Sequence, residues 1–156
     1  QYLVTGGAGF VGAAVVAALA ARGDRVVAFD QRPSQRIGDI TRAYDTVRFV
    51  SGDVLEWAGL ATVMQELRPD AVVHCAAIVG VAASLDTPAQ TMRVNVEGSL
   101  NVLEAMRLFG VRRWNASPPG PPRCGAPGGE DRMPKAVRMR GAFTIDCPIG
   151  EPLVVG

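Results

Sequence analysis

The stretch that decides the fold is Thr5-Gly6-Gly7-Ala8-Gly9-Phe10-Val11-Gly12. An apolar run at residues 2–5 precedes it and predicts a buried strand. A run rich in Ala, Val and Leu at residues 10–22 follows it. That second run predicts a helix that is apolar, and therefore buried, nearly all round. The glycines thus stand where a strand turns into a helix.

The glycine spacing contains G-x-G-x-x-G, which has a specific physical use in that place. One glycine permits a tight turn, one lets backbone N–H groups approach a pyrophosphate, and one lets the helix pack closely on the sheet. The helix N-terminus adds unpaired N–H donors and the positive end of its dipole. We therefore predict a dinucleotide-binding turn, with a ligand-free glycine turn as the alternative. The expected contacts come from Gly6, Gly7, Gly9, Phe10, Val11 and Gly12.

An acidic residue closes the second predicted strand, residues 25–30. Asp30 lies 18 residues after Gly12, close to the separation of about 20 at which a carboxylate binds the adenosine ribose hydroxyls. The same carboxylate would repel a 2′-phosphate, which favours NAD over NADP. Arg32 could pair with that phosphate, so NADP stays open as the less favoured cofactor. A purely structural Asp30 that caps the next turn is the other alternative.

The rest of the N-terminal part alternates between strand and helix patterns. The further predicted elements are strands at 46–51, 71–75 and 111–115 and helices at 56–67 and 88–109. Pro88 suits the first turn of its helix, and Gly23 and Gly110 are placed to end helices. This alternation predicts an α/β fold with a doubly wound parallel sheet, a Rossmann-like fold that is incomplete after the fifth strand.

Composition and charge narrow the class of protein. The chain has 156 residues, 48% of them hydrophobic and 20% charged, with a net charge of +1. These values favour a soluble globular domain and give no basic stripe for nucleic acid. No apolar run is long enough to span a membrane, and no signal peptide is recognisable. The three cysteines form no C-x-x-C pair, so we expect no disulfide framework, no metal site and a cytoplasmic location.

The composition changes near residue 114. Eight of the eleven prolines and seven of the eighteen glycines fall in residues 114–156. We therefore predict two parts: a dinucleotide-binding domain at 1–113 and an irregular Pro/Gly-rich tail at 114–156 with one candidate strand at 142–147.

Several further motifs follow the glycine turn along the chain. They are Gly52-Asp53-Val54, the run from Pro69 to Ala77 (PDAVVHCAA), the run from Asn95 to Ala105 (NVEGSLNVLEA) and Gly110-Val111-Arg112-Arg113. Together with residues 5–12 they resemble the extended short-chain dehydrogenases/reductases, the NAD-dependent epimerase/dehydratase family of nucleotide-sugar enzymes. The resemblance covers residues 2–113.

The resemblance implies roles at matching positions. Asp53 would bond the adenine amino group with Val54 against the ring, Ala76 and Ala77 would line the cofactor, and Asn95 would organise the active-site backbone and water. A helix N-cap is the alternative for Asp53, and an exposed helix position is the alternative for Asn95. The implied substrate of a full-length parent is a nucleotide sugar, and a homodimer of that parent stays open.

For two other polar residues, His74 and Ser84, a structural role is weighed against a functional one. His74, the only histidine, lies inside an apolar strand and reads as a satisfied core residue rather than a catalyst. Ser84 follows the fourth strand near the place where the family binds nicotinamide or substrate. An ordinary loop role explains it equally well.

The family's Tyr-x-x-x-Lys pair has no match in this sequence. The lysine of that pair lowers the tyrosine pKa so that the tyrosine acts as a base. The only tyrosines are Tyr2 and Tyr44, neither precedes Lys135 by four residues, and Ser117 falls early for the family's serine. We therefore assign no catalytic residue. A non-catalytic NAD(P)-binding sensor is the alternative function. The tail could be frameshifted, degenerate or a new substrate segment, and we favour the first.

Overall fold

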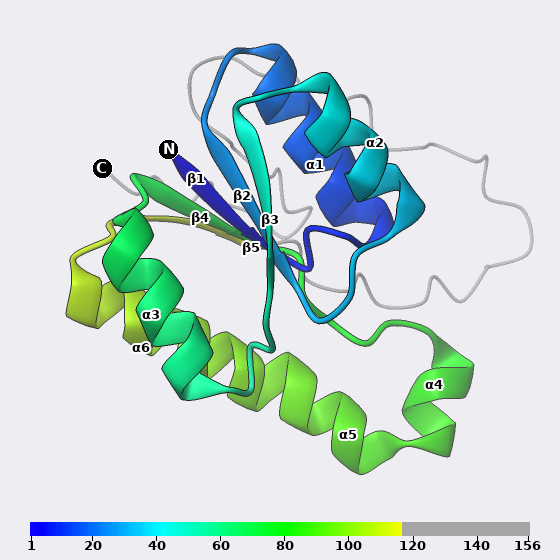
Figure 1. Ribbon diagram of the computed structural model, residues 1–156. Coiled ribbons are helices and arrows are strands. Elements are labelled where there is room, and N and C mark those ends of the chain that lie inside the picture. The colour runs from blue at the N-terminus through cyan, green and yellow to red at the C-terminus, as the bar shows by residue number, and fades with distance from the viewer. Residues whose placement is uncertain (117–156) are drawn as a thin grey trace, which may run out of the picture. The chain divides into compact units, whose positions relative to one another are not determined.

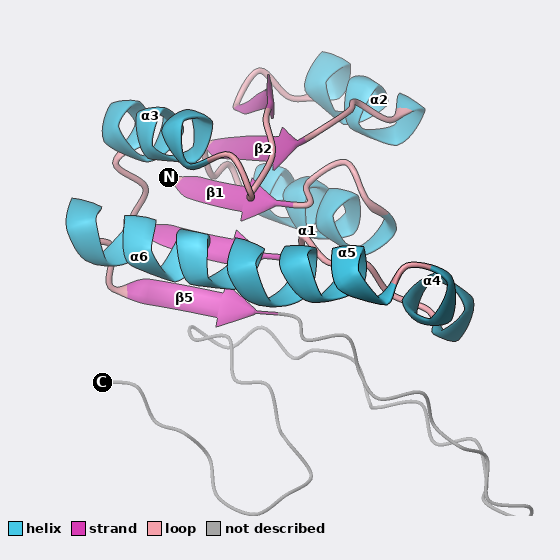
Figure 2. Cartoon of the chain, turned by 90° about the horizontal axis from the view of Figure 1, so that it is seen from below, coloured by secondary structure: helices cyan, strands magenta, loops and turns pink. Residues whose placement is uncertain are grey.

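The computed structural model describes residues 1–116, which form a sheet of five parallel strands (Figures 1 and 2). The strands are β1 (Tyr2–Thr5), β2 (Val26–Asp30), β3 (Val47–Ser51), β4 (Ala71–His74) and β5 (Arg113–Ala116). Their order is β3-β2-β1-β4-β5, the order of a doubly wound nucleotide-binding sheet up to its fifth strand. The predicted fold is thereby confirmed. The predicted tail and its candidate strand at 142–147 lie outside the described residues.

Helices cover both faces of the sheet (Figure 1). α1 (Phe10–Ala21) and α2 (Gln35–Ala43) lie on one face, and α3 (Trp57–Leu67) and α6 (Ser99–Phe109) lie on the other. Neighbouring residues of one strand point to opposite faces of the sheet. Leu3 packs in the core on the α3 and α6 side, whereas Val4 packs in the core on the α1 and α2 side. The strands are therefore apolar on both faces, as a covered parallel sheet requires.

The first helix is less buried than its composition suggested. Phe10 is 87% exposed and Val11 is 50% exposed, so the prediction of burial nearly all round was wrong. A helix in the outer layer of a sheet buries only the stripe that faces the strands. The helix ends at Ala21, and Gly23 follows with a positive φ of 83°, which agrees with its predicted role at the helix end.

Two short helices were missed in the sequence. α2 begins after Ser34, whose side chain accepts a hydrogen bond from the Ile37 N–H at 3.3 Å, and it buries Ile37 and Ile40. α4 (Val81–Asp86) projects from the body of the fold (Figure 1). α4, with six residues, is too short to show a period of 3.6 residues, whereas α2 carries an apolar pair, Ile37 and Ile40, at helical spacing that the sequence-based prediction passed over.

The long predicted helix at 88–109 is divided into three segments. α5 (Pro88–Met92) begins at the proline as predicted, a π-helical segment η1 (Arg93–Gly98) follows, and α6 ends at Gly110 with φ 71°. The Val111 N–H still bonds the Met106 carbonyl of that helix end. β5 therefore starts at Arg113 rather than at the predicted residue 111.

Candidate dinucleotide-binding site

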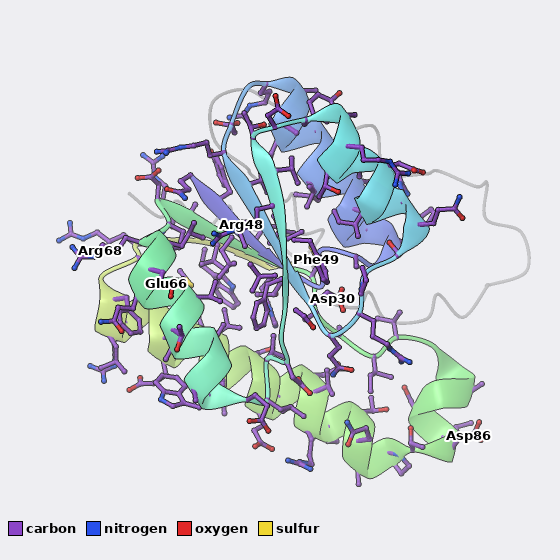
Figure 3. The ribbon with its side chains drawn as sticks, in the orientation of Figure 1. Asp30, Arg48, Phe49, Glu66, Arg68 and Asp86 are labelled. Carbon is purple, nitrogen blue, oxygen red and sulfur yellow. The ribbon has the colours of Figure 1, made fainter. Side chains whose placement is uncertain are left out.

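The candidate site lies at the carboxyl ends of the parallel strands. β1 pairs with β2 on one side and β4 on the other, so the chain reverses its direction of winding at β1. Ligands of open α/β sheets bind in the crevice at this switch point. Figure 3 shows Asp30 at this end, while Glu66 and Arg68 lie at the other end of the strands.

The glycine turn is built so closely that side chains are excluded. Gly6 has φ 65°, and a Cβ there would stand 2.6 Å from the Ala76 nitrogen on the neighbouring loop. A Cβ on Gly12 would overlap the carbonyl oxygen of Gly6. The Gly9 N–H bonds that same carbonyl at 3.0 Å. Gly6 and Gly12 thus hold the tight positions that the sequence spacing predicted.

The N-terminus of α1 suits an anion. Its N-cap is Gly9, no side chain caps it, and its first turn carries no acidic residue. The first-turn N–H groups, those of Phe10, Val11 and Gly12, therefore face the turn without a side-chain acceptor, and the helix dipole adds positive potential. Arg36 lies beside them, with Nη1 3.4 Å from the Phe10 oxygen and its guanidinium carbon 5.7 Å from the Phe10 ring centroid. These features fit the pyrophosphate of a dinucleotide.

Asp30 is part of the same assembly. Its Oδ2 accepts the Ala8 N–H at 3.0 Å and its Oδ1 accepts the Gln31 N–H at 2.8 Å. A carboxylate oxygen has two lone pairs, so each still has room for a ribose hydroxyl. The cap-only alternative is therefore incomplete, because Asp30 also reaches across to the glycine turn. Arg32 is exposed in the turn beyond β2.

Gln31 joins the two acidic positions and was missed in the sequence. Its Nε2 donates to Asp53 Oδ2 at 2.9 Å, and its carbonyl accepts the Ser51 hydroxyl at 3.0 Å. Asp53 Oδ1 accepts the Leu55 N–H at 2.9 Å, which is an Asx turn, whereas the N-cap of α3 is Glu56. Asp53 is therefore not the helix N-cap that the sequence left open. The signal for Gln31 was its place directly after Asp30.

Val54 is held by η1 and α6, which lie on the same side of the sheet. It is 6% exposed, and its carbonyl accepts the side-chain amide of Asn101 at 3.0 Å. A Cβ on Gly98 would come within 2.7 Å of a Val54 methyl group, so η1 approaches this loop closely. Gly98 and Asn101 both lie in the sequence motif from Asn95 to Ala105, but the motif did not show that they contact Val54.

The loop after β4 is held by Asn95. Its Oδ1 accepts the Ile78 N–H at 2.8 Å, and its Nδ2 donates to the Ile78 carbonyl at 2.9 Å. Asn95 is half-buried, which contradicts the exposed-face alternative. Ala76 and Ala77 precede Ile78 and are half-buried, and the backbone of Ala76 lies against Gly6 of the glycine turn.

The two other polar candidates, His74 and Ser84, differ in their surroundings. His74 is 5% exposed and has a hydrogen-bond partner at each ring nitrogen, which confirms it as a satisfied core residue. Ser84 lies in α4 rather than in a loop, and its hydroxyl bonds the Gly80 carbonyl at 2.9 Å. Residues 1–116 contain no group of three or more His, Cys, Asp or Glu placed to hold a metal. Within the same residues no helix is long and apolar enough to cross a membrane.

Comparisons of the sequence and the structure with known proteins point to the same family. Residues 2–118 match the NAD dependent epimerase/dehydratase family. A UDP-glucose 4-epimerase of Mycolicibacterium smegmatis is 39% identical over 113 residues, which are 71% of this chain and 36% of that protein. A 3-beta-hydroxysteroid dehydrogenase of Mycolicibacterium neoaurum is 30% identical over an alignment that covers 100% of this chain and 43% of that protein.

A solved structure shares the fold. The UDP-glucose 4-epimerase of Stenotrophomonas maltophila, with bound NAD and formylated UDP-arabinopyranose, superposes with a TM-score of 0.69 at 33% identity. The match covers 74% of this chain and 36% of that one, so the chain spans about a third of the length of these epimerases. The family match extends over the whole described sheet and its glycine turn. The chain therefore belongs to the NAD dependent epimerase/dehydratase family.

Proposed function

We propose that this chain is the NAD-binding part of an epimerase/dehydratase-type oxidoreductase that acts on a nucleotide sugar. One observation carries the proposal: the uncapped N-terminus of α1 and the Asp30 carboxylate lie at one sheet edge, joined by the Ala8 hydrogen bond. The first supplies donors for a pyrophosphate, and the second supplies acceptors for a ribose. The relatives that act on UDP-sugars support the substrate class.

The proposed cofactor contacts follow the path of a dinucleotide across the sheet edge. The glycine turn would bind the pyrophosphate, Asp30 the adenosine ribose, and Asp53 with Val54 the adenine. Ala76 and Ala77 would lie toward the nicotinamide, with Asn95 holding the loop behind them. NAD accepts and returns a hydride when it is bound, and these residues bind and orient it.

We propose that NAD is preferred to NADP. The Asp30 carboxylate would repel a 2′-phosphate, and two backbone N–H groups hold its two oxygens in place. Arg32 and Arg36 are the cations near enough in sequence to oppose that preference. Of these, Arg36 is engaged with Phe10.

We propose that residues 1–113 bind cofactor without completing the chemistry. A Tyr-x-x-x-Lys pair is not in the sequence, and loss of general acid–base help costs about 10²–10⁴-fold in rate. The substrate-binding part and any homodimer would belong to a longer parent protein, which we place in the cytoplasm.

A second candidate substrate rests on a separate observation. The match to the 3-beta-hydroxysteroid dehydrogenase runs over the whole chain, residues 114–156 included, whereas the match to the Mycolicibacterium smegmatis epimerase covers 71% of it. A parent enzyme that oxidises a steroid alcohol with the same cofactor site would fit that reach.

The test combines cofactor binding with turnover. Calorimetry of the chain with NAD and NADP should give one NAD site per chain and weaker NADP binding. The coding sequence after codon 114 is then used to complete the parent protein. That protein is assayed with a nucleotide-sugar panel and with a 3β-hydroxysteroid. Turnover of a nucleotide sugar supports the proposal, and turnover of the steroid alone selects the second candidate. NAD binding with no turnover of either would favour the non-catalytic sensor.

A further inference from the structure

Three hydrogen bonds run in series through the core beneath the candidate site. Thr5 Oγ1 lies 2.6 Å from His74 Nδ1, and His74 Nε2 lies 2.9 Å from Ser99 Oγ. Ser99 Oγ lies 2.7 Å from the Asn95 carbonyl oxygen. The series crosses from β1 through β4 to the start of α6 and ends inside η1.

Counting the hydrogens fixes the direction of every bond. A carbonyl oxygen only accepts, so the single Ser99 hydroxyl hydrogen points to Asn95. Ser99 Oγ must then accept from His74, which places the imidazole hydrogen on Nε2. His74 Nδ1 is left as an acceptor for the Thr5 hydroxyl. Each group gives one hydrogen and none is left over, provided that His74 is neutral.

Both ends of this series meet the cofactor site. Thr5 directly precedes Gly6, the first glycine of the turn. At the other end Ser99 bonds the carbonyl of Asn95, whose side chain holds both backbone groups of Ile78. The segment that Asn95 holds follows Ala76 and Ala77 directly.

We infer that His74 is a positioning residue: as the neutral Nε2–H tautomer it orients Ser99, and Ser99 fixes η1 so that Asn95 holds the loop after β4. The link to cofactor binding rests on the proposed function, whereas the link from His74 to Ile78 does not. The described partners of the ring are the hydroxyls of Thr5 and Ser99, with no carboxylate among them.

Hydrogen exchange of two amides in the chain without cofactor tests the inference. The Ile78 N–H reports the hold of Asn95, and the Val73 N–H in β4 reports the stability of the whole sheet. Ser99→Ala should speed exchange at Ile78 by roughly three- to tenfold more than at Val73, the effect of losing one ordinary hydrogen bond. Ser84→Ala is the matched control, because Ser84 makes the same bond to a carbonyl four residues back, outside the series.

Two further measurements keep the inference testable if a variant is unstable. Nitrogen NMR of the single histidine should show a protonated Nε2 and an unprotonated Nδ1 in the unmodified chain. His74→Leu should loosen Ile78, and His74→Gln, which keeps a donor toward Ser99, should restore part of its protection. Equal changes at Ile78 and Val73, or an Nδ1–H tautomer, would overturn the inference. Failure of the unmodified chain to bind NAD would instead count against the proposed function.

Discussion

The carboxylate of Asp30 accepts a hydrogen bond from the backbone N–H of Ala8 at 3.0 Å, so the acid that ends β2 is tied to the glycine turn that follows β1. The two residues stand 22 positions apart in the chain. This bond places a negative charge beside the end of α1 that we propose binds the pyrophosphate. One carboxylate can therefore both shape the turn and select the cofactor.

Asp30→Asn should separate those two roles. The amide oxygen can still accept the Ala8 N–H, while the charge that repels a 2′-phosphate is removed. We expect NAD to bind somewhat more weakly and NADP to bind more tightly, so that the preference between them narrows or reverses. Calorimetry with both cofactors measures the ratio. An unchanged ratio would move the origin of selectivity away from Asp30.

Gly12→Ala should destabilise the chain and abolish NAD binding, because the added methyl group would overlap the Gly6 carbonyl. Forcing a methyl into such a packed place costs about 1–3 kcal/mol. Gly59→Ala is the control, since a Cβ there meets nothing within 4 Å in a helix and should stabilise by about 0.5–1 kcal/mol. Urea unfolding and NAD titration of both variants give the comparison. Equal effects would show that the turn is not tight.

Gln31→Ala should lower NAD affinity with little change in stability. The exposed Gln31 side chain donates a hydrogen bond to Asp53. Without that bond, the Asp53 carboxylate that we assign to adenine is less firmly positioned. Surface substitutions usually change stability by less than about 0.5 kcal/mol. Gln65→Ala, at an exposed position of α3, is the matched control for calorimetry. Affinities that agree for the two variants would leave Gln31 without a role at the site.

Stability should rise with pH in a window set by His74. Burial lowers the pKa of the His74 imidazole below its usual value of 6.5, so the unfolded chain binds a proton more readily than the folded chain. The free energy of unfolding therefore falls as pH drops below about 6.5 and toward the folded pKa. His74→Gln should lose that part of the slope. Hydrogen bonds lower the pKa values of the Asp70 and Glu104 carboxyls, which act at more acidic pH in both proteins. Parallel pH profiles would contradict the prediction.

The sequence predicted what local patterns encode. The parallel sheet, the glycine turn, the acid after β2 and the helix ends at Gly23 and Gly110 all follow from short-range patterns and the alternation of strands with helices, whereas the strand order was not predicted. The hydrogen bonds of Gln31 and Asn101 were not predictable, because each joins segments that meet only in the folded sheet. η1 was also missed, and Asn95 within it bonds Ile78, a contact across 17 positions that the sequence does not show.

The central claim is that NAD binds at the carboxyl edge of this sheet, and amide NMR during an NAD titration tests it most directly. The account predicts saturable shifts that gather at residues 6–12, 30–32, 53–54 and 76–78. A pocket at the opposite edge of the sheet is lined in part by Gln1, Arg25, Thr46 and Arg48. The amide signals of these residues should stay unchanged. Saturable shifts at that pocket with none in the glycine turn, or no saturable shifts in a folded chain, would contradict the account.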